Sequence, residues 1–248
     1  MSLSVTLHPW KGTPRALAPE RPLFALSDIH GYSGAFRSVI RHLERISAGH
    51  EIALLGDLTS RGPDSLGCVR EALRIRHKPA FSGCVMIRGN HCVALRGALE
   101  GDAWAANIMG RGAWTQIRVA STGRAARSDI TTYLGGLRDY AVRGGLLLTH
   151  AVPDPGIRAD RQPWDLLIWR RDFVDATVGW RRVAGRDALL VHGHTAGGGP
   201  EVMDDDLARR EAVCVDFGTC RSRRIGVAEF DPAGRVRLIE FGMNGRPG

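Results

Sequence analysis

A carboxylate and an imidazole stand two residues apart near the start of the chain, in Asp28-Ile-His30-Gly31. They follow the apolar run 23–26, which predicts a short buried strand, and Gly31 predicts a tight turn out of it. Because side chains alternate along an extended chain, we expect Asp28 and His30 to lie on the same side. An Asp oxygen and a His nitrogen that converge at a strand end form half of a site for a divalent transition metal.

The same arrangement recurs at four later places in the chain. Apolar segments end in Gly56-Asp57, in Gly89-Asn90-His91, in His150 and in His192-Gly193-His194. A single histidine in a core needs no functional explanation. Five separate strand ends that all carry nitrogen or oxygen donors do need one, because a strand end has no structural need for such side chains. The mixture of carboxylates, imidazoles and one amide, without a thiol, favours a pair of manganese, iron or zinc ions. Two such ions can clamp the attacking and leaving oxygens of a displacement at phosphorus.

The elements that must position these residues alternate between strands and helices. After the first strand, Ser33 begins a helix whose apolar residues recur at helical spacing up to Ile46. A strand over 51–55, a helix over 64–76 and a strand over 83–88 follow. Strand–turn–helix units in succession predict an α/β architecture with its site at the carboxyl ends of the strands.

The remainder of the chain departs from this repeat. Residues from about 92 to 143 predict a helical excursion, and we interpret its Trp104 and Trp114 chiefly as packing residues. Strands are expected again before His150 and His194, and the tail 212–241 predicts short antiparallel strands. We therefore expect an extended N-terminal arm (1–20) and a single domain (21–248) built as a two-sheet sandwich flanked by helices.

Composition places the chain among soluble globular proteins, with 44% hydrophobic and 24% charged residues. No apolar run approaches the ~20 residues of a membrane span, and no secretory signal is visible. The five cysteines lack Cys-x-x-Cys spacing. This favours reduced thiols in the cytoplasm over a disulfide framework or a zinc–thiolate site.

The net charge of +8 raises the question of a nucleic-acid partner. Only two of the 34 basic residues are lysines, and the arginines are spread along the chain without a long cluster. Compositional bias toward arginine explains this, and attraction of an anionic substrate remains open. A catalytically silent basic nucleic-acid-binding module is the alternative from a different class, but it leaves the filled metal-ligand positions unexplained.

Taken together, these motifs resemble those of the calcineurin-like metallophosphoesterases, and in particular the bacterial and phage-type phosphoprotein (Ser/Thr) phosphatases. The symmetrical diadenosine tetraphosphatases share the motifs. The resemblance extends from Leu23 to Gly218, in order and with matching spacing. It implies a four-layer α-β-β-α sandwich of two mixed sheets that carries two divalent metal ions.

The resemblance also implies a role for each motif residue. Asp28 and His30 would bind the first metal, and Asp57 would bridge the two. The second metal would be bound by Asn90, His150 and His194. His91 would protonate the leaving oxygen, and Arg61 and Arg171 would hold the phosphoryl oxygens. For Arg171, a plain surface position is the alternative.

Several positions depart from the family pattern. Ser60 stands where many members carry an Asp that orients the acid histidine, and Cys92 replaces the usual acid after the third motif. We interpret Cys92 as packed. Ala196 occupies a position where other calcineurin-like esterases have a metal-binding histidine, which agrees with the phosphatase branch. We interpret His192 as a packed or supporting histidine, and Asp216 as a structural or supporting residue.

The implied reaction is hydrolysis of phosphate monoesters by a metal-bridging hydroxide. The expected substrate is a phosphorylated protein or a phosphate-ester small molecule, with phosphoserine and phosphothreonine preferred. The alternative is a symmetrical bis(5'-nucleosyl)-tetraphosphatase, which an aromatic platform at Trp104 or Trp114 would favour. We expect specificity to come from the excursion 92–143 and the loop 197–210, because the motifs describe only the phosphoryl site.

Overall fold

The larger of two sheets is built from both ends of the chain. The computed structural model describes residues 3–13, 17–154, 156–171, 188–199 and 212–244. The strand order is β1-β11-β10-β3-β4-β5, with β2 also paired to β11. Strands β3, β4 and β5 are parallel, and the other pairs are antiparallel. The strands are β1 (Leu3–Leu7), β2 (Lys11–Gly12), β3 (Leu23–Leu26), β4 (Glu51–Leu54), β5 (Gly83–Met86), β10 (Arg224–Asp231) and β11 (Arg235–Met243).

The second sheet has the order β6-β7-β8-β9. Its strands are β6 (Ala141–Arg143), β7 (Leu146–Leu148), β8 (Leu189–His192) and β9 (Ala212–Cys214). The pair β6–β7 is antiparallel, whereas β7, β8 and β9 are parallel. Both sheets are therefore mixed.

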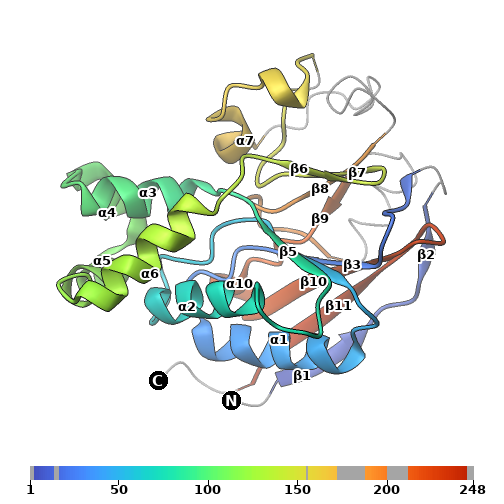
Figure 1. Cartoon of the computed structure of the whole chain (residues 1–248), viewed down its shortest axis with the longest axis horizontal. Coiled ribbons are helices and arrows are strands. Elements are labelled where there is room, and N and C mark those ends of the chain that lie inside the picture. Colours follow the sequence, from blue (N-terminus) through green and yellow to red (C-terminus); the bar gives the residue numbers. More distant parts are fainter. Residues whose placement is uncertain (1–2, 14–16, 155, 172–187, 200–211, 245–248) are drawn as a thin grey trace.

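Alternation along the strands divides the core into layers. Ala25 of β3 and Ala53 of β4 pack with Leu148 of β7 and Val191 of β8 between the two sheets. On the opposite face, Phe24, Leu26, Ile52 and Leu54 pack against α1 (Ser33–Ile46) and α2 (Ser65–Ile75). Figure 1 shows these two helices below the larger sheet.

The outer face of the smaller sheet packs on the segment that follows β7. Leu147 and Leu190 lie against Val152 and against Ala159 of the short helix η2 (Ala159–Arg161), and α7 (Leu166–Trp169) comes next in the chain. Helices therefore flank a pair of stacked mixed sheets. This confirms the predicted α/β sandwich.

Four helices separate β5 from β6: α3 (Asn90–Leu99), α4 (Ala103–Met109), α5 (Arg111–Ala120) and α6 (Arg124–Gly135). They pack around Leu95, Met109, Ile117 and Ile130, and they project from one end of the sandwich in Figure 1. The helical excursion was expected to reach residue 143, but residues 141–143 form β6 instead. The strand is favoured there because it completes a hairpin with β7.

Two other segments differ from expectation or extend it. The antiparallel prediction for 212–216 is wrong, because β9 runs parallel to β8. The turn at Gly218 carries the chain from the smaller sheet to the larger one instead of closing a hairpin. The predicted antiparallel hairpin at 232–234 is present between β10 and β11. Within the expected N-terminal arm, residues 3–7 form the edge strand β1 on β11.

Most of the predicted specificity loop 197–210 lies outside the described residues. The domain boundary at residue 20 stays a prediction. Among the described residues, no helix has the length and apolar character needed to cross a membrane.

Glu229 of β10 is a buried carboxylate with two basic partners. Its Oε2 accepts a hydrogen bond of 2.7 Å from Arg237 Nε, and its Oε1 lies 3.3 Å from His50 Nε2. The His50 ring stacks on Phe24 of β3, with ring centroids 4.0 Å apart. Burial raises the pKa of Glu229, but its hydrogen bonds to His50 and Arg237 outweigh this and hold the pKa below its ordinary value.

We expect Glu229→Gln to lower the free energy of unfolding by about 1–2 kcal/mol at neutral pH, because a charged hydrogen-bonding group is lost. A depressed folded-state pKa stabilises the fold above the unfolded-state value, and this contribution disappears as pH falls through the folded-state pKa. The difference between variant and wild type should therefore shrink below about pH 4.5. Urea unfolding over a pH series measures it. Asp160→Asn, which breaks an exposed pair with Arg158, is the control and should change little. A deficit that persists unchanged at low pH would contradict the assignment.

Candidate metal centre

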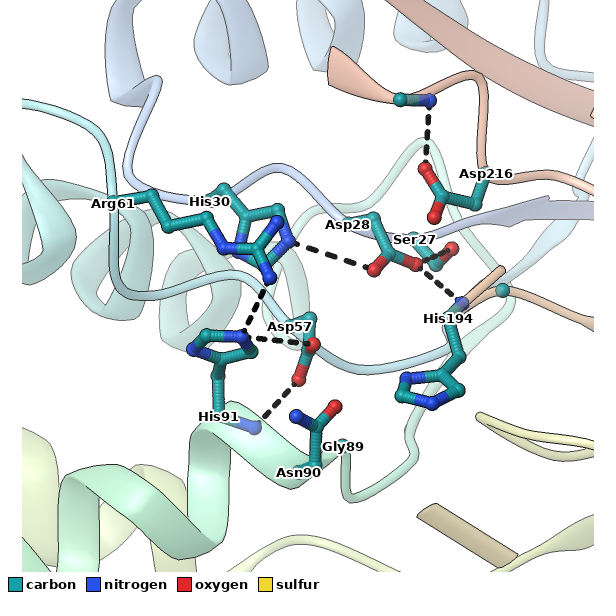
Figure 2. Close-up of polar contacts among 12 residues, drawn as sticks. Ser27, Asp28, His30, Asp57, Arg61, Gly89, Asn90, His91, His194 and Asp216 are labelled. Carbon is teal, nitrogen blue, oxygen red and sulfur yellow. Dashed lines mark hydrogen bonds and ion pairs between the residues drawn. The ribbon is translucent and has the colours of Figure 1, made fainter. Parts of the chain in front are cut away.

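The polar loops that follow the parallel strands surround one cavity of about 140 Å³. Of the predicted site residues, Asp28, His30, Asp57, Asn90, His194, Arg61 and Arg171 line it. The other residues of its wall are Ala196, Asp216, Gly218, Cys220 and Arg221. His150 is fully buried and contacts Asp57, and His91 lies beside both Asp57 and Arg61. Figure 2 shows the side chains of Asp28, His30, Asp57, Asn90 and His91 gathered in this region.

Asp57 occupies the centre of the cluster. Its Oδ1 accepts a hydrogen bond of 2.9 Å from the backbone N–H of His91. Its Oδ2 lies 3.4 Å from His150 Nε2 and 3.9 Å from His91 Nε2. Burial raises the pKa of Asp57, but the charges of His150 and His91 outweigh this and hold it well below the ordinary value. Asp57 is therefore a buried carboxylate that stays charged.

Asp57 also belongs to both groups of side chains that could hold a metal ion. It joins His30 and His91 in one group and His150 and His194 in the other. Within each group the potential ligand atoms lie within 4.8 Å of one another. A shared carboxylate between two donor groups is the arrangement that a bridging ligand requires.

Asp28 and His30 converge, but not by the alternation expected from the sequence. Both residues have left-handed backbone conformations, with φ of 54° and 48°. The N–H groups of Asp28 and His30 donate to the carbonyls of Gly56 and Asp57, which ties this loop to the loop after β4. Asp28 Oδ1 consequently lies 3.7 Å from His30 Nε2. The expectation of an extended chain was wrong, although the two side chains do meet.

The Asp28 carboxylate also links the two sheets. Its Oδ2 accepts hydrogen bonds from Ser27 Oγ and, at 3.0 Å, from the backbone N–H of His194 after β8. Burial, followed by the nearby charge of Asp216, raises the pKa of Asp28 well above its ordinary value. Such a carboxylate is stabilised in its charged form when a cation binds beside it.

The imidazoles of His30 and His150 share a hydrogen-bonding pattern typical of metal-binding histidines. His30 Nδ1 lies 3.2 Å from the carbonyl of Thr59, and His150 Nδ1 lies 2.7 Å from the carbonyl of Leu55. Donation from Nδ1 to a backbone carbonyl leaves the lone pair of Nε2 available. His150 Nε2 then faces two acceptors, Asn90 Oδ1 at 3.1 Å and the Asp57 carboxylate. A proton on His150 Nε2, or a metal ion bound between the three groups, is needed to satisfy His150 Nε2, Asn90 Oδ1 and the Asp57 carboxylate together.

The pKa values of the imidazoles agree with this distribution of charge. Burial lowers the pKa of His30 and of His194 to about 3, so both rings are neutral at pH 7. Burial also acts to lower the pKa of His150, but Asp57 and Asp28 outweigh it and raise the pKa to about 9. The donor set of carboxylates, imidazoles and one amide oxygen fits a pair of divalent ions.

Two glycines make room for this cluster. A Cβ at Gly56 would lie 2.6 Å from His150 Nδ1, and a Cβ at Gly89 would lie 2.1 Å from Asp57 Oδ1. Both distances are shorter than side chains tolerate. The glycines of the Gly-Asp and Gly-Asn-His motifs therefore allow the loops to approach the ligands closely.

The candidate catalytic side chains lie at the edge of the cluster. Arg61 Nη2 is 3.2 Å from His91 Nε2, and the backbone N–H of Arg61 donates to the carbonyl of Met109 at the end of α4. Arg171 Nη1 donates to the carbonyl of His194 at 3.2 Å. Arg171 is thus part of the cavity wall.

Ser60 does not replace the expected Asp as a partner of His91. Ser60 Oγ and His91 Nδ1 are both buried, and neither has a hydrogen-bond partner among the described residues. Burial, opposed by Asp57, lowers the pKa of His91. His91 therefore lacks the second carboxylate that would support its protonation.

Of the remaining predicted residues, Cys92 and His192 are buried. Cys92 Sγ lies 3.4 Å from the Tyr133 hydroxyl, which agrees with a packed thiol. His192 ends β8, with its Nδ1 2.9 Å from the carbonyl of Gly193. Asp216 lines the cavity and accepts a hydrogen bond of 2.7 Å from the N–H of Gly218.

The interpretation of Trp104 as a packing residue is wrong. Its side chain is 58% exposed and lies 6.0 Å from the ring of Trp169, which in turn lies 6.5 Å from the His194 ring. Trp114 does pack, within the cluster formed by α3 to α6. Sequence reasoning missed the place of Trp169 beside the cluster, although its position just before Arg170-Arg171 was a usable signal.

The second feature missed was the wall formed by Gly218, Cys220 and Arg221. The Asp216-Phe-Gly218 strand end was its signal, because the chain turns there beside the site.

Several solved structures share this fold. A provisionally assigned diadenosine tetraphosphatase is 22% identical, with a TM-score of 0.61 over 95% of this chain and 100% of that chain. A serine/threonine phosphatase from Saccharomyces cerevisiae is 15% identical, with a TM-score of 0.60 over 95% and 86%. A cold-active protein-tyrosine phosphatase from a psychrophilic Shewanella species is 12% identical, with a TM-score of 0.63 over 92% and 80%. At these identities the similarity shows the fold alone.

A comparison with curated protein sequences found no match. The model of the calcineurin-like phosphoesterase family matches residues 21–219, which include every predicted metal ligand. Enzymes of this family depend on a dinuclear metal centre, and the cluster around Asp57 contains groups that can hold metal ions. The chain therefore belongs to the calcineurin-like phosphoesterases.

Proposed function

We propose that this protein hydrolyses phosphate monoesters with two divalent metal ions held around Asp57, and that its substrates are phosphoserine and phosphothreonine of proteins. The observation that carries the reaction type is the position of Asp57, which is shared by two donor groups beside a cavity that Arg61 and Arg171 also line. Asp28 and His30 would complete one metal site, and Asn90, His150 and His194 would complete the other.

When bound, the two ions would lower the pKa of a water molecule that attacks phosphorus and would offset negative charge on the phosphoryl oxygens. The residues of the chain supply orientation and proton transfer. Guanidinium groups match the geometry of phosphate oxygens, and their fixed charge stabilises the transition state. Arg61 and Arg171 lie at the cavity with such groups available.

We propose His91 as the general acid. It is the second residue of α3, its N–H is fixed by Asp57, and its Nε2 lies beside the Arg61 guanidinium that would hold the phosphoryl group. A proton on Nε2 would therefore be delivered close to the leaving oxygen.

The size of the cavity supports a protein substrate. At about 140 Å³ it is smaller than the roughly 300–1,000 Å³ of pockets that enclose a drug-sized ligand. It would hold the phosphoryl group and leave the rest of the substrate on the surrounding surface. A phosphorylated side chain on a protein meets this requirement.

A specific observation also favours a second candidate, a symmetrical bis(5'-nucleosyl)-tetraphosphatase. The exposed ring of Trp104 and the neighbouring ring of Trp169 extend outward from His194. Exposed tryptophan rings next to a phosphoryl site can stack on an adenine base.

For Asp57→Asn we expect activity to disappear and metal content, close to two ions in the wild type, to fall. The variant loses the charge that would neutralise both ions. Mass spectrometry of the purified, manganese-loaded protein measures the content. Asp129→Asn, which alters a surface pair with Arg70, should retain both ions. If Asp57→Asn binds two ions and keeps full activity, the assignment of Asp57 as the bridging ligand is refuted.

For His91→Ala we expect turnover of an alkyl phosphate to fall by roughly 10²–10⁴-fold. Turnover of p-nitrophenyl phosphate should fall much less, since an activated aryl leaving group needs little protonation. Steady-state kinetics on both substrates, with metal content checked in parallel, provide the comparison. Equal losses on the two substrates would remove His91 from the acid role.

Hydrolysis of a phosphoserine peptide and of diadenosine tetraphosphate should be measured side by side with the manganese-loaded enzyme. We expect rapid phosphate release from the peptide. If the dinucleotide is instead cleaved symmetrically and rapidly, the second candidate is correct, and Trp104→Ala should then raise KM for the dinucleotide without changing that for p-nitrophenyl phosphate. Trp114→Phe, within the helical cluster, is the matched control.

A further inference from the structure

Three arginines gather around the cavity. Arg61, Arg171 and Arg221 line it, and none forms an ion pair with a carboxylate in the described part of the chain. Elsewhere arginines do pair, as Arg70 does with Asp129 and Arg143 does with Glu51. Unpaired guanidinium groups gathered at one cavity indicate a site that binds anions.

The three carboxylates of the cavity are engaged by other groups. Asp28 accepts from Ser27 and the N–H of His194, and Asp57 accepts from the N–H of His91. Asp216 accepts from the N–H of Gly218. The charge of Arg61 also acts on Asp216, whereas Arg221 forms no ion pair with any of these three carboxylates in the described part of the chain, so its positive charge is left available to a ligand.

Arg221 is placed by a rigid turn after β9. Gly218 has a left-handed conformation with φ of 70° and begins the short helix α10 (Thr219–Ser222). The N–H of Arg221 donates to the carbonyl of Gly218 at 2.8 Å, and Asp216 holds the N–H of Gly218. The backbone at Arg221 is thus fixed to the strand end that lines the site.

The same turn lies against Arg61. Cys220 lines the cavity, and the Arg61 guanidinium lowers the pKa of its thiol against the larger raising effect of burial. Arg221 is therefore a neighbour of the phosphoryl-binding arginine, on a separate element of the fold.

One phosphoryl group does not account for all of this charge. Arg61 contacts His91 and Arg171 contacts the His194 carbonyl, so both are fixed over the cluster where the transferred phosphoryl group would bind. Arg221 makes neither contact and remains exposed at the wall. With two divalent ions present, a third guanidinium exceeds what a single phosphoryl dianion needs.

We propose that Arg221 binds a second anionic group of the substrate, adjacent to the phosphoryl group that is transferred. This inference rests on the proposed phosphoesterase function and narrows its substrate class. The second anion is a neighbouring carboxylate in a phosphorylated protein, or the next phosphate in a polyphosphate chain. A guanidinium binds both through paired hydrogen bonds.

The test compares Arg221→Gln with wild type on substrates that differ in the second anion. These are p-nitrophenyl phosphate, phosphoserine peptides with Asp or Ala after the phosphoserine, and diadenosine tetraphosphate. We expect kcat/KM to fall roughly 10–100-fold on the substrate with the recognised second anion and to stay within about twofold on p-nitrophenyl phosphate and the Ala peptide. A fall in kcat/KM on the Asp peptide identifies the second anion as a carboxylate, and a fall on the dinucleotide identifies it as a phosphate.

Arg221→Lys keeps the charge and should recover part of the loss. Arg224→Gln is the matched control, because Arg224 is exposed, pairs with Glu240 and is not part of the cavity wall. Equal effects of Arg221→Gln on every substrate, or no effect on any, would overturn the proposal.

A binding measurement separates this inference from the proposed function. Calorimetric titration of the manganese-loaded protein with inorganic phosphate and with diphosphate, at matched free manganese, requires no turnover. Arg221→Gln should weaken diphosphate binding and leave phosphate binding unchanged. If the wild-type protein hydrolyses none of the substrates, the phosphoesterase proposal is refuted. If Arg221→Gln weakens the binding of phosphate and of diphosphate equally, the proposed role of Arg221 is refuted.

Discussion

The burial of charge at Asp57 is the constraint on which the rest of the site depends. A carboxylate in this environment is costly unless compensating groups surround it. Here the N–H and the ring of His91, together with the ring of His150, provide that compensation, and the two residues come from different segments of the chain. The cluster therefore requires strand ends from both sheets to meet at one place. Two mixed sheets stacked face to face satisfy this requirement.

Backbone conformation is the second cost of assembling the site. Asp28, His30, Asp57, Ser60, Arg61 and His194 all have positive φ, a conformation that side-chain-bearing residues adopt rarely. Such residues persist when the surrounding structure holds them, and they concentrate at functional sites. In this protein, hydrogen bonds between neighbouring loops hold these residues in place. One of them runs from the N–H of His30 to the carbonyl of Asp57.

The same fold occurs in phosphatases with different leaving groups. Solved structures with this fold include a serine/threonine phosphatase, a protein-tyrosine phosphatase and a provisionally assigned diadenosine tetraphosphatase. Beyond the proposed metal ligands, Trp104 on α4 and Trp169 on α7 lie next to each other near His194, and Arg221 on α10 lines the cavity. These elements contribute little to the core between the sheets. Selection for substrate can therefore alter them without disturbing Asp57 and its partners.

The sequence by itself determined most of the order of strands and helices, though not β1 or β6, together with the α/β sandwich and the identity of the polar residues at the strand ends. It did so because apolar periodicity and glycine placement are local properties. Tertiary structure decided which sheet accepts residues 212–214, because strand pairing depends on distant partners. It also decided that Asp28 and His30 meet through left-handed residues, and that Trp104 is exposed beside Trp169. Arg221 reaches the cavity wall for the same reason: residues 28, 57, 171 and 221 become neighbours only when the two sheets stack and their loops share one edge.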